Sequence, residues 1–175
     1  MTDTALVADR VLAATVPSPA GDLAVLVHDD VLVSCGFGTP DEQYARLRTS
    51  SPLRRVNDLG AFSAALSAYF AGDLTAMNDL PVHQRGGPFQ QAAWKVMREI
   101  PPGTTITYTE LATRAGSPRA ARAAGSACAI NLIAPVVPCH RVLRGGGALG
   151  GYAYGLSRKE WLLAHERDAS AAPSR

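Results

Sequence analysis

The chain keeps its strand-like segments apart from its helical ones, and this order limits the possible folds more than any other feature. Short β-rich runs separated by polar turns are confined to the beginning of the chain, at residues 11–16, 23–27 and 31–33. Such spacing predicts an antiparallel meander. Helical periodicity governs the remainder, so we expect a small mixed part followed by a mainly helical part.

Helices in the first part are expected over residues 40–48 and 59–71. The second of these helices places four large side chains on one face, Phe62, Leu66, Tyr69 and Phe70. The segment 73–87 is rich in proline and glycine and is interpreted as a linker. We therefore expect an α/β domain over residues 1–87 and a helical domain over residues 88–175.

Prolines, glycines and capping residues mark the helices of the second part. Pro88 opens a helix that places Phe89, Ala93, Val96, Met97 and Ile100 on one face, and the Pro101-Pro102-Gly103 segment ends it. Ser157 and Glu160 are interpreted as the capping box of a final helix. The Ala/Ser/Pro-rich tail after Arg167 is expected to fray.

A pair of short helices is predicted between these two. Thr107 and Glu110 form a capping box, which predicts the first helix of the pair. Ser117 followed by Pro118 is interpreted as the N-cap and first residue of the second helix. Residues 108–130 therefore show the spacing of a helix-turn-helix.

Charge is distributed unevenly along the chain. The net charge is only +2, but residues 1–87 hold 6 Lys/Arg against 10 Asp/Glu, and residues 88–175 hold 11 against 5. This asymmetry favours an anionic partner for the second part. A solvated basic face is the alternative.

The second helix of the pair presents a face of small side chains. Small residues let a helix backbone approach another surface closely, and Ala123, Ser126 and Ala127 are the candidates for such contact. Arg119 and Arg122 lie one predicted helical turn apart and could meet phosphates. Docking on DNA and close packing within a plain helical domain both fit this pattern.

Cys139 and His140 are candidates for nucleophilic chemistry. A thiol with an ordinary pKa of about 8.5 is little ionised near neutrality, so an imidazole that takes its proton would activate it. Glu166 is the candidate to orient the imidazole, because Glu160 is assigned to the capping box. Pro138 predicts an irregular backbone here, or a bridging water. A structural cysteine beside a structural histidine is the alternative.

Cofactor and metal sites are not expected. Residues 145–150 match G-x-G-x-x-G, but the sequence after them does not predict the helix that a dinucleotide site needs. A mobile loop is expected there, with Tyr152 able to stack on a planar ring. The histidines and cysteines lack the spacing of zinc ligands.

The cysteines also bear on location. Cys35, Cys128 and Cys139 are too few for a disulfide framework and fit a reducing compartment. The sequence has no secretory-signal pattern and no apolar stretch of about 18 residues, so we expect a cytoplasmic protein that does not span a membrane.

Together these features resemble the O6-alkylguanine-DNA alkyltransferases, the methylated-DNA–protein-cysteine methyltransferase family. The resemblance covers residues 88–166 and rests on Asn131, on Pro138-Cys139-His140-Arg141, and on Gly150-x-Tyr152-x-x-Gly155 followed by Lys159-x-x-Leu162-Leu163-x-x-Glu166. It implies an α/β, ribonuclease H-like N-terminal domain of structural role, a mainly α C-terminal domain with a helix-turn-helix, and no cofactor.

The resemblance implies how the reactive residues would act. Cys139 would accept an alkyl group, His140 would draw off its proton through a water, and Glu166 would hold His140. Asn131 would connect the helix pair to the cysteine segment. Arg141 would be a buried structural ion-pair partner.

The implied partner is double-stranded DNA with alkylated bases. Arg122 would enter the base stack from the minor groove, Tyr108 would press on the flanking phosphate, and the target nucleotide would rotate out of the duplex. The base pocket would be walled by Val142, Tyr152, Ala153 and Tyr154. The lesion would be O6-alkylguanine, with O4-alkylthymine left open, and each protein would react once. A monomer is expected, with clustering on DNA left open.

Two residues depart from the family pattern. Leu132 stands where the family usually has Pro after the Asn, and it is expected to loosen the hinge, the connection at residues 131–132 between the helix pair and the cysteine segment. The bulk of Tyr154 is expected to narrow the base pocket. A DNA-binding sensor that does not react and a cysteine hydrolase are the alternative functions. The non-reacting relatives replace the cysteine, and a hydrolase needs an oxyanion hole that the sequence does not identify.

Overall fold

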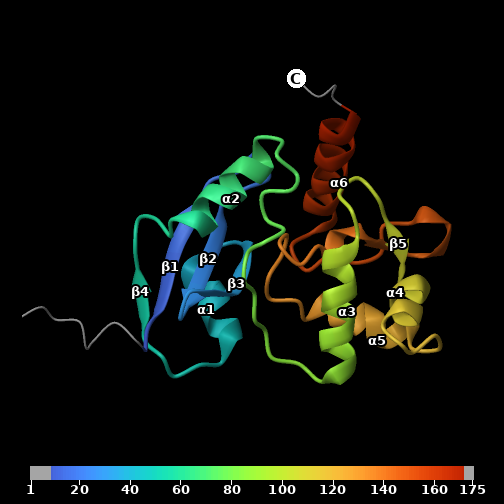
Figure 1. The fold of residues 1–175 in the computed structure, drawn as a ribbon, viewed down its shortest axis with the longest axis horizontal. Helices are drawn as coiled ribbons and strands as arrows, with labels where there is room; N and C mark the ends of the chain where they lie inside the picture. Colours follow the sequence, from blue (N-terminus) through green and yellow to red (C-terminus); the bar gives the residue numbers. More distant parts are fainter. Residues whose placement is uncertain (1–8, 172–175) are drawn as a thin grey trace, which may run out of the picture.

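A computed structural model describes residues 9–171 and shows a sheet-containing part beside a helical part (Figure 1). The first part contains β1 (Val11–Val16), β2 (Leu23–His28), β3 (Val31–Phe37), α1 (Pro40–Leu47), β4 (Leu53–Arg55) and α2 (Ala61–Phe70). The second part contains α3 (Pro88–Glu99), β5 (Ile106–Thr107), α4 (Tyr108–Arg114), α5 (Ala121–Ala129), β6 (Val142–Leu143) and α6 (Leu156–Ala171).

The sheet of the first part has the strand order β3-β2-β1-β4. The predicted antiparallel meander of β1, β2 and β3 is confirmed. Strand β3 continues to Phe37, beyond the predicted end at Val33, because its last residues pair with β2. Strand β4 was not expected and pairs parallel with β1.

Alternation along β2 decides which helix covers which face of the sheet. Leu23 and Val25 belong to the main core together with Leu66 and Tyr69 of α2. Ala24 and Leu26 belong to a smaller core that packs against Tyr44 and Leu47 of α1. Successive strand residues point to opposite faces, so α1 and α2 cover opposite sides of the sheet.

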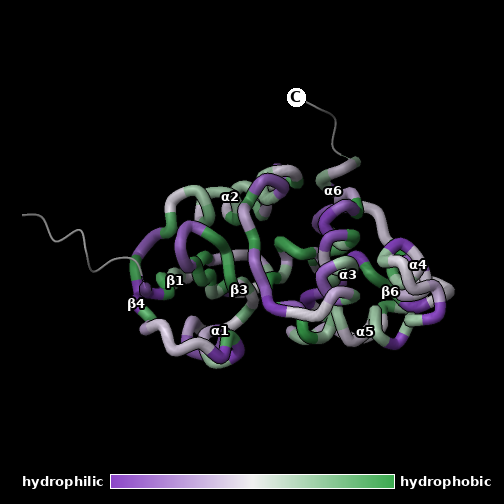
Figure 2. Tube along the Cα trace, turned by 60° about the horizontal axis from the view of Figure 1, so that its bottom comes forward, coloured by the Kyte–Doolittle hydropathy of each residue, from purple (hydrophilic) through white to green (hydrophobic). Residues whose placement is uncertain are grey.

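The segment between α2 and α3 is packed against the sheet. Figure 2 shows much of it as hydrophilic, as the interpretation as a linker expects. However, Leu32 of β3 donates its N–H to the carbonyl of Pro81 at 2.9 Å and pairs with Val82. Met77 and Leu80 are buried. This segment is therefore fixed along β3, where it can hold side chains in place for the second part.

The predicted face of α3 is buried, as its spacing requires. Ala93, Val96, Met97 and the C-cap Ile100 all lie in the core, and the partly buried Phe89 packs against it. Trp94 is also buried, and its Nε1 donates to the carbonyl of Ala127 at 3.0 Å. Helix α3 therefore holds α5 directly through a hydrogen bond.

The start of the second paired helix differs from the prediction. The Thr107–Glu110 capping box of α4 is present, but α5 begins at Ala121. The carbonyl of Ser117 accepts from the N–H of Ala120 at 2.9 Å, which closes a turn with Pro118 at its second position. Proline suits that turn position and a first helical residue equally well, because both require the same φ.

The final helix begins two residues earlier than expected and extends further. Because α6 starts at Leu156, Ser157 lies within its first turn and does not have the predicted N-cap position. Helix α6 continues to Ala171, so the predicted fraying after Arg167 is wrong over 168–171. The rest of that tail lies outside the described residues. Within residues 9–171, no helix has the length and apolar character that crossing a bilayer requires.

Candidate active site

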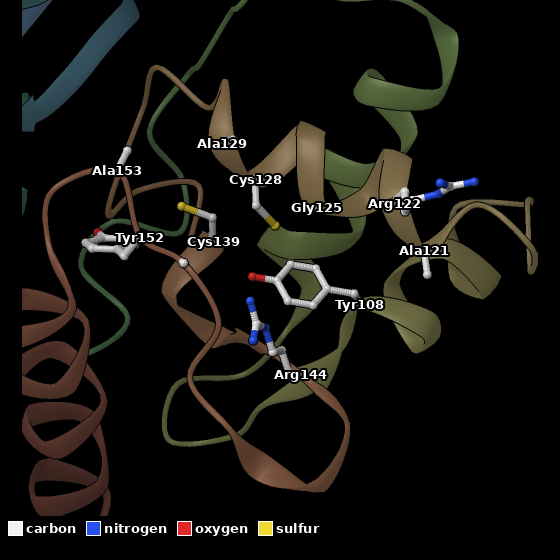
Figure 3. A pocket seen from close by; sticks show the side chains of 11 residues that line it. Tyr108, Ala121, Arg122, Gly125, Cys128, Ala129, Cys139, Arg144, Tyr152 and Ala153 are labelled. Carbon is white, nitrogen blue, oxygen red and sulfur yellow. The ribbon is translucent and has the colours of Figure 1, made fainter.

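Cys139 lies at the edge between a cleft and the core. It opens a single 3₁₀ turn, Cys139–Arg141, so the backbone after Pro138 is irregular as predicted. The side chain is only 6% exposed and borders a cleft of about 750 Å³. Figure 3 shows Tyr108, Cys128, Cys139 and Tyr152 around this cleft, contributed by α4, α5, the 3₁₀ turn and the loop before α6.

The Asn131 side chain connects the end of α5 to the cysteine segment. Its Nδ2 donates to the carbonyl of Val137 at 2.8 Å and to the Cys139 sulfur at 3.3 Å. Its Oδ1 accepts from the N–H of Ile133 at 3.1 Å. Burial raises the pKa of Cys139, and the Asn131 hydrogen bond opposes that rise. An N–H donor therefore favours the thiolate in a site that otherwise disfavours it.

Glu166 is the centre of a buried polar cluster. Its carboxylate accepts from His140 Nε2 at 2.7 Å, from Tyr69 Oη at 2.7 Å and from the N–H of Gly103 at 3.1 Å. Arg141 donates Nε and Nη2 to the same carboxylate at 3.0 and 2.8 Å. Burial alone would raise the pKa of Glu166, but the bonds and charges of His140 and Arg141 hold it well below its usual range.

The contacts of His140 select its tautomer. Burial lowers the pKa of His140, so the ring is neutral near neutral pH. Since Nε2 faces a carboxylate, this nitrogen carries the proton and Nδ1 is the proton acceptor. Nδ1 is buried and has no hydrogen-bond partner among residues 9–171. The ring can therefore take a proton at Nδ1 while Glu166 stabilises the resulting charge.

Helix α5 divides the predicted DNA-contacting residues into two groups. Arg122, Ala123 and Ser126 are exposed, but Ala127 is fully buried and cannot touch a macromolecular partner. Arg119 is exposed in the turn before α5, not one helical turn from Arg122. In Figure 3 the Arg122 side chain points away from Cys139, whereas the Tyr108 hydroxyl points into the cleft.

Two of the four predicted pocket residues border the cleft. Tyr152 and Ala153 line it, but Val142 is buried in β6 and does not. Tyr154 does not line the cleft either, so its bulk does not narrow the cleft as expected. Its hydroxyl accepts from Arg46 Nη1 of α1 at 2.6 Å, and its ring packs edge-on against Phe37.

Gly36 makes this position of Tyr154 possible, because a Cβ at Gly36 would overlap the Tyr154 hydroxyl. We expect Gly36→Ala to destabilise the protein by about 1–3 kcal/mol, the usual cost of an overpacked core. Gly145→Ala is the control, since its Cβ would meet nothing within 4 Å. Urea unfolding measures both. Equal stability of the two variants would contradict this packing.

The hinge after α5 is also firmer than expected. The carbonyl of Leu132 accepts from the N–H of Cys35 at 2.8 Å and from Ser34 Oγ at 3.2 Å. Its N–H donates to Gln84 Oε1 at 2.9 Å, a bond that proline cannot make. The predicted loosening at Leu132 is therefore wrong, because this residue is bonded to β3 and to the segment before α3.

Two residues of the site have a role that was not predicted from the sequence. The Lys159 side chain is buried and donates to the carbonyls of Val142, Leu149 and Gly151 at 2.7, 2.5 and 3.3 Å. It thereby shapes the loop beside the cleft. The sequence predicted Tyr69 only as one of the large side chains on one face of α2. For Lys159 the signal was its place in the family motif, and for Tyr69 no sequence signal points to Glu166.

Comparison with known proteins identifies the family. Residues 88–168 match the model of the DNA-binding domain of 6-O-methylguanine DNA methyltransferase. A methylated-DNA–protein-cysteine methyltransferase of Shigella flexneri is 46% identical over 125 residues, which are 71% of this chain and 69% of the relative. One of Mycobacterium tuberculosis is 43% identical over 163 residues, covering 91% of this chain and 93% of the relative.

A solved structure supports the same assignment. The crystal structure of Mycobacterium tuberculosis OGT in complex with DNA superimposes with a TM-score of 0.76 at 39% identity, covering 94% of this chain and 96% of that chain. The sequence relatives also extend across both parts of the fold. The chain therefore belongs to the methylated-DNA–protein-cysteine methyltransferase family.

Proposed function

We propose that this protein repairs DNA by moving the alkyl group of O6-alkylguanine permanently onto Cys139. The observation that carries this proposal is the arrangement around one thiol. Cys139 borders the cleft, Asn131 donates to its sulfur, and the neighbouring His140 is held by Glu166. Nothing in this arrangement would remove the alkyl group again, so each protein reacts once.

The proposed step balances without a cofactor. His140 takes the thiol proton at Nδ1, through a bridging water. The sulfur electron pair forms a bond to the alkyl carbon, and the bond from that carbon to O6 breaks. The electrons of that bond remain on guanine, which accepts a proton as it leaves. Tyr108, whose hydroxyl points into the cleft, is the proposed proton donor to the base. The product is a thioether on Cys139.

Burial of Cys139 supports a rotated nucleotide. The sulfur of a cysteine that is only 6% exposed cannot reach a carbon inside a stacked duplex. We therefore propose that the lesion leaves the stack and enters the cleft, between α5 and the loop that holds Tyr152 and Ala153. Helices α4 and α5 would act as a helix-turn-helix in the minor groove, where the small exposed side chains of α5 permit close approach.

We also propose domain boundaries, a second lesion, an oligomeric state and a location for this protein. Residues 1–87 would form the ribonuclease H-like domain, and residues 88–175 the DNA-binding and acceptor domain. The start of α3 at Pro88 agrees with that boundary. O4-alkylthymine is proposed as a second lesion. We also propose that the protein is a monomer that acts on chromosomal DNA in the cytoplasm, where several copies cluster along the DNA.

Intact mass after incubation with an O6-methylguanine duplex tests the proposal. We expect one methyl group per protein, and no gain for Cys139→Ser. Tight binding without a mass change would favour a non-reacting sensor. Many substrates converted by each protein would favour a hydrolase. Either of the last two results would overturn the proposal.

Arg122 tests the placement of α5 on DNA. The side chain is exposed and borders the cleft, so we propose that it fills the space the lesion leaves. Arg122→Ala should slow transfer in duplex DNA by about 10-fold or more, if the lost contact is worth about 1–3 kcal/mol. Single-turnover transfer measures this, with Arg167→Ala on α6 as an exposed control. If Arg122→Ala equals wild type in rate and affinity, α5 does not enter the groove as proposed.

A further inference from the structure

Gln84 is a buried amide that contacts two residues of the hinge after α5. It lies in the segment before α3 and is 6% exposed. Its Nε2 donates to Asn131 Oδ1 at 3.0 Å, and its Oε1 accepts from the N–H of Leu132 at 2.9 Å. Its own carbonyl accepts from Gln91 Nε2 of α3 at 2.7 Å. Both ends of the side-chain amide are therefore engaged by consecutive residues.

These contacts decide which way the Asn131 amide points. Asn131 Oδ1 faces two donors, Gln84 Nε2 and the N–H of Ile133. A reversed amide would turn its NH₂ group toward both donors, so the oxygen is fixed there. The nitrogen must then face the Val137 carbonyl and the Cys139 sulfur, as it does.

We propose that Gln84 is a positioning residue for Cys139, because it holds the Asn131 amide in the orientation that donates to the sulfur. This inference rests on the proposed role of Cys139 as the acceptor. Leu132 completes the arrangement, since its N–H fixes the orientation of the Gln84 amide. Leu132 and Gln84 thus act as a pair, and the departure from the usual Pro at position 132 supplies the N–H that this pair needs.

The reactivity of the Cys139 thiol with iodoacetamide, followed from pH 6 to pH 10, tests this role without DNA. Gln84→Leu keeps most of the side-chain volume but removes both bonds. We expect it to move the pH midpoint of Cys139 alkylation upward, and to slow methyl transfer by about five-fold, the effect of one typical hydrogen bond. Arg85→Ala, an exposed neighbour, should leave both unchanged.

Other groups act on the thiol and are the same in every variant. They are Arg46 on α1, Tyr108 on α4, Cys128 on α5, Tyr152 in the loop and Lys159 on α6. The alkylated cysteine is therefore identified by mass spectrometry of the tryptic peptide of residues 123–141. This peptide contains both Cys128 and Cys139, and its fragmentation distinguishes them. A shift confined to Cys139 is then attributable to the altered hydrogen bonds.

Two further variants separate positioning from general stability. Gln84→Glu can still accept from Leu132, but its carboxylate would face Asn131 Oδ1, so we expect the larger shift. Leu132→Pro removes the donor to Gln84, so Gln84→Leu should have less effect in that background.

An unshifted midpoint in Gln84→Leu and Gln84→Glu would overturn the inference, even if both variants lost stability. If Gln84→Leu does not fold, an unshifted midpoint in Leu132→Pro and Gln84→Glu overturns it equally. Failure of wild-type protein to take methyl groups from DNA would instead overturn the proposed function, and would leave the comparison of thiol profiles intact.

Discussion

Replacing Glu166 by Ala is expected to lower the free energy of unfolding by about 3–5 kcal/mol, the usual cost of breaking a buried ion pair from one side. The carboxylate accepts from His140, Arg141, Tyr69 and Gly103, and it has no exposed surface. Its removal leaves Arg141 as a buried charge without an anion. Glu160→Ala, an exposed position on the same helix, should change stability by less than about 0.5 kcal/mol.

The same cluster predicts that the protein loses stability as the pH falls. Because the folded pKa of Glu166 is lowered, its contribution to stability is complete above the ordinary glutamate pKa and is lost as the pH falls toward the folded value. The lowered pKa of His140 acts in the same direction, since the unfolded chain gains that proton first as the pH falls below about 6.5. The free energy of unfolding, measured from pH 7 to pH 3, should therefore fall less in Glu166→Ala than in wild type. Parallel curves would contradict the role of this carboxylate.

Replacing His140 by Ala is expected to slow methyl transfer by about 10²–10⁴-fold, the range of a lost general base. Within residues 9–171, His140 is the only side chain bonded to Glu166 that can also receive a proton at neutral pH, because Tyr69 and Arg141 already donate theirs. Raising the pH should recover part of the loss, since hydroxide then removes the thiol proton directly. Affinity for duplex DNA should change little.

The exposed His83→Ala variant is the matched control for this rate. Single-turnover transfer against pH distinguishes a missing base from a damaged fold. A rate near that of wild type at pH 7, or a loss that no increase in pH relieves, would exclude His140 as the proton acceptor.

The sequence predicted what depends on local patterns. The strands of the meander, the buried face of α3 and the capping box of α4 all follow from residues close together in the chain. The three-residue strand β4 escaped prediction because so short a segment has no usable periodicity. The start of α5 was misplaced because Pro118 suits a turn as well as a helix.

The residues proposed to react could be named from the sequence, but most of the residues that support them could not. Cys139, His140 and Glu166 follow from the chemistry of a thiol and from the resemblance. Gln84 and Tyr69 reach the site across 47 and 97 residues of sequence, and no spacing rule connects such pairs. Lys159 resembles a surface lysine until its three carbonyl partners are known. Hydrogen bonds between residues far apart in the sequence leave no local pattern from which they could be predicted.

Cys128 makes the central claim unusually testable, because this second thiol borders the same cleft as Cys139. After reaction with a saturating O6-methylguanine duplex, free thiols are counted in the denatured protein and the peptide of residues 123–141 is sequenced by mass spectrometry. We predict that two of the three cysteines remain free and that the methyl group is found on Cys139. Three free cysteines, or a methyl group on Cys128, would contradict the account.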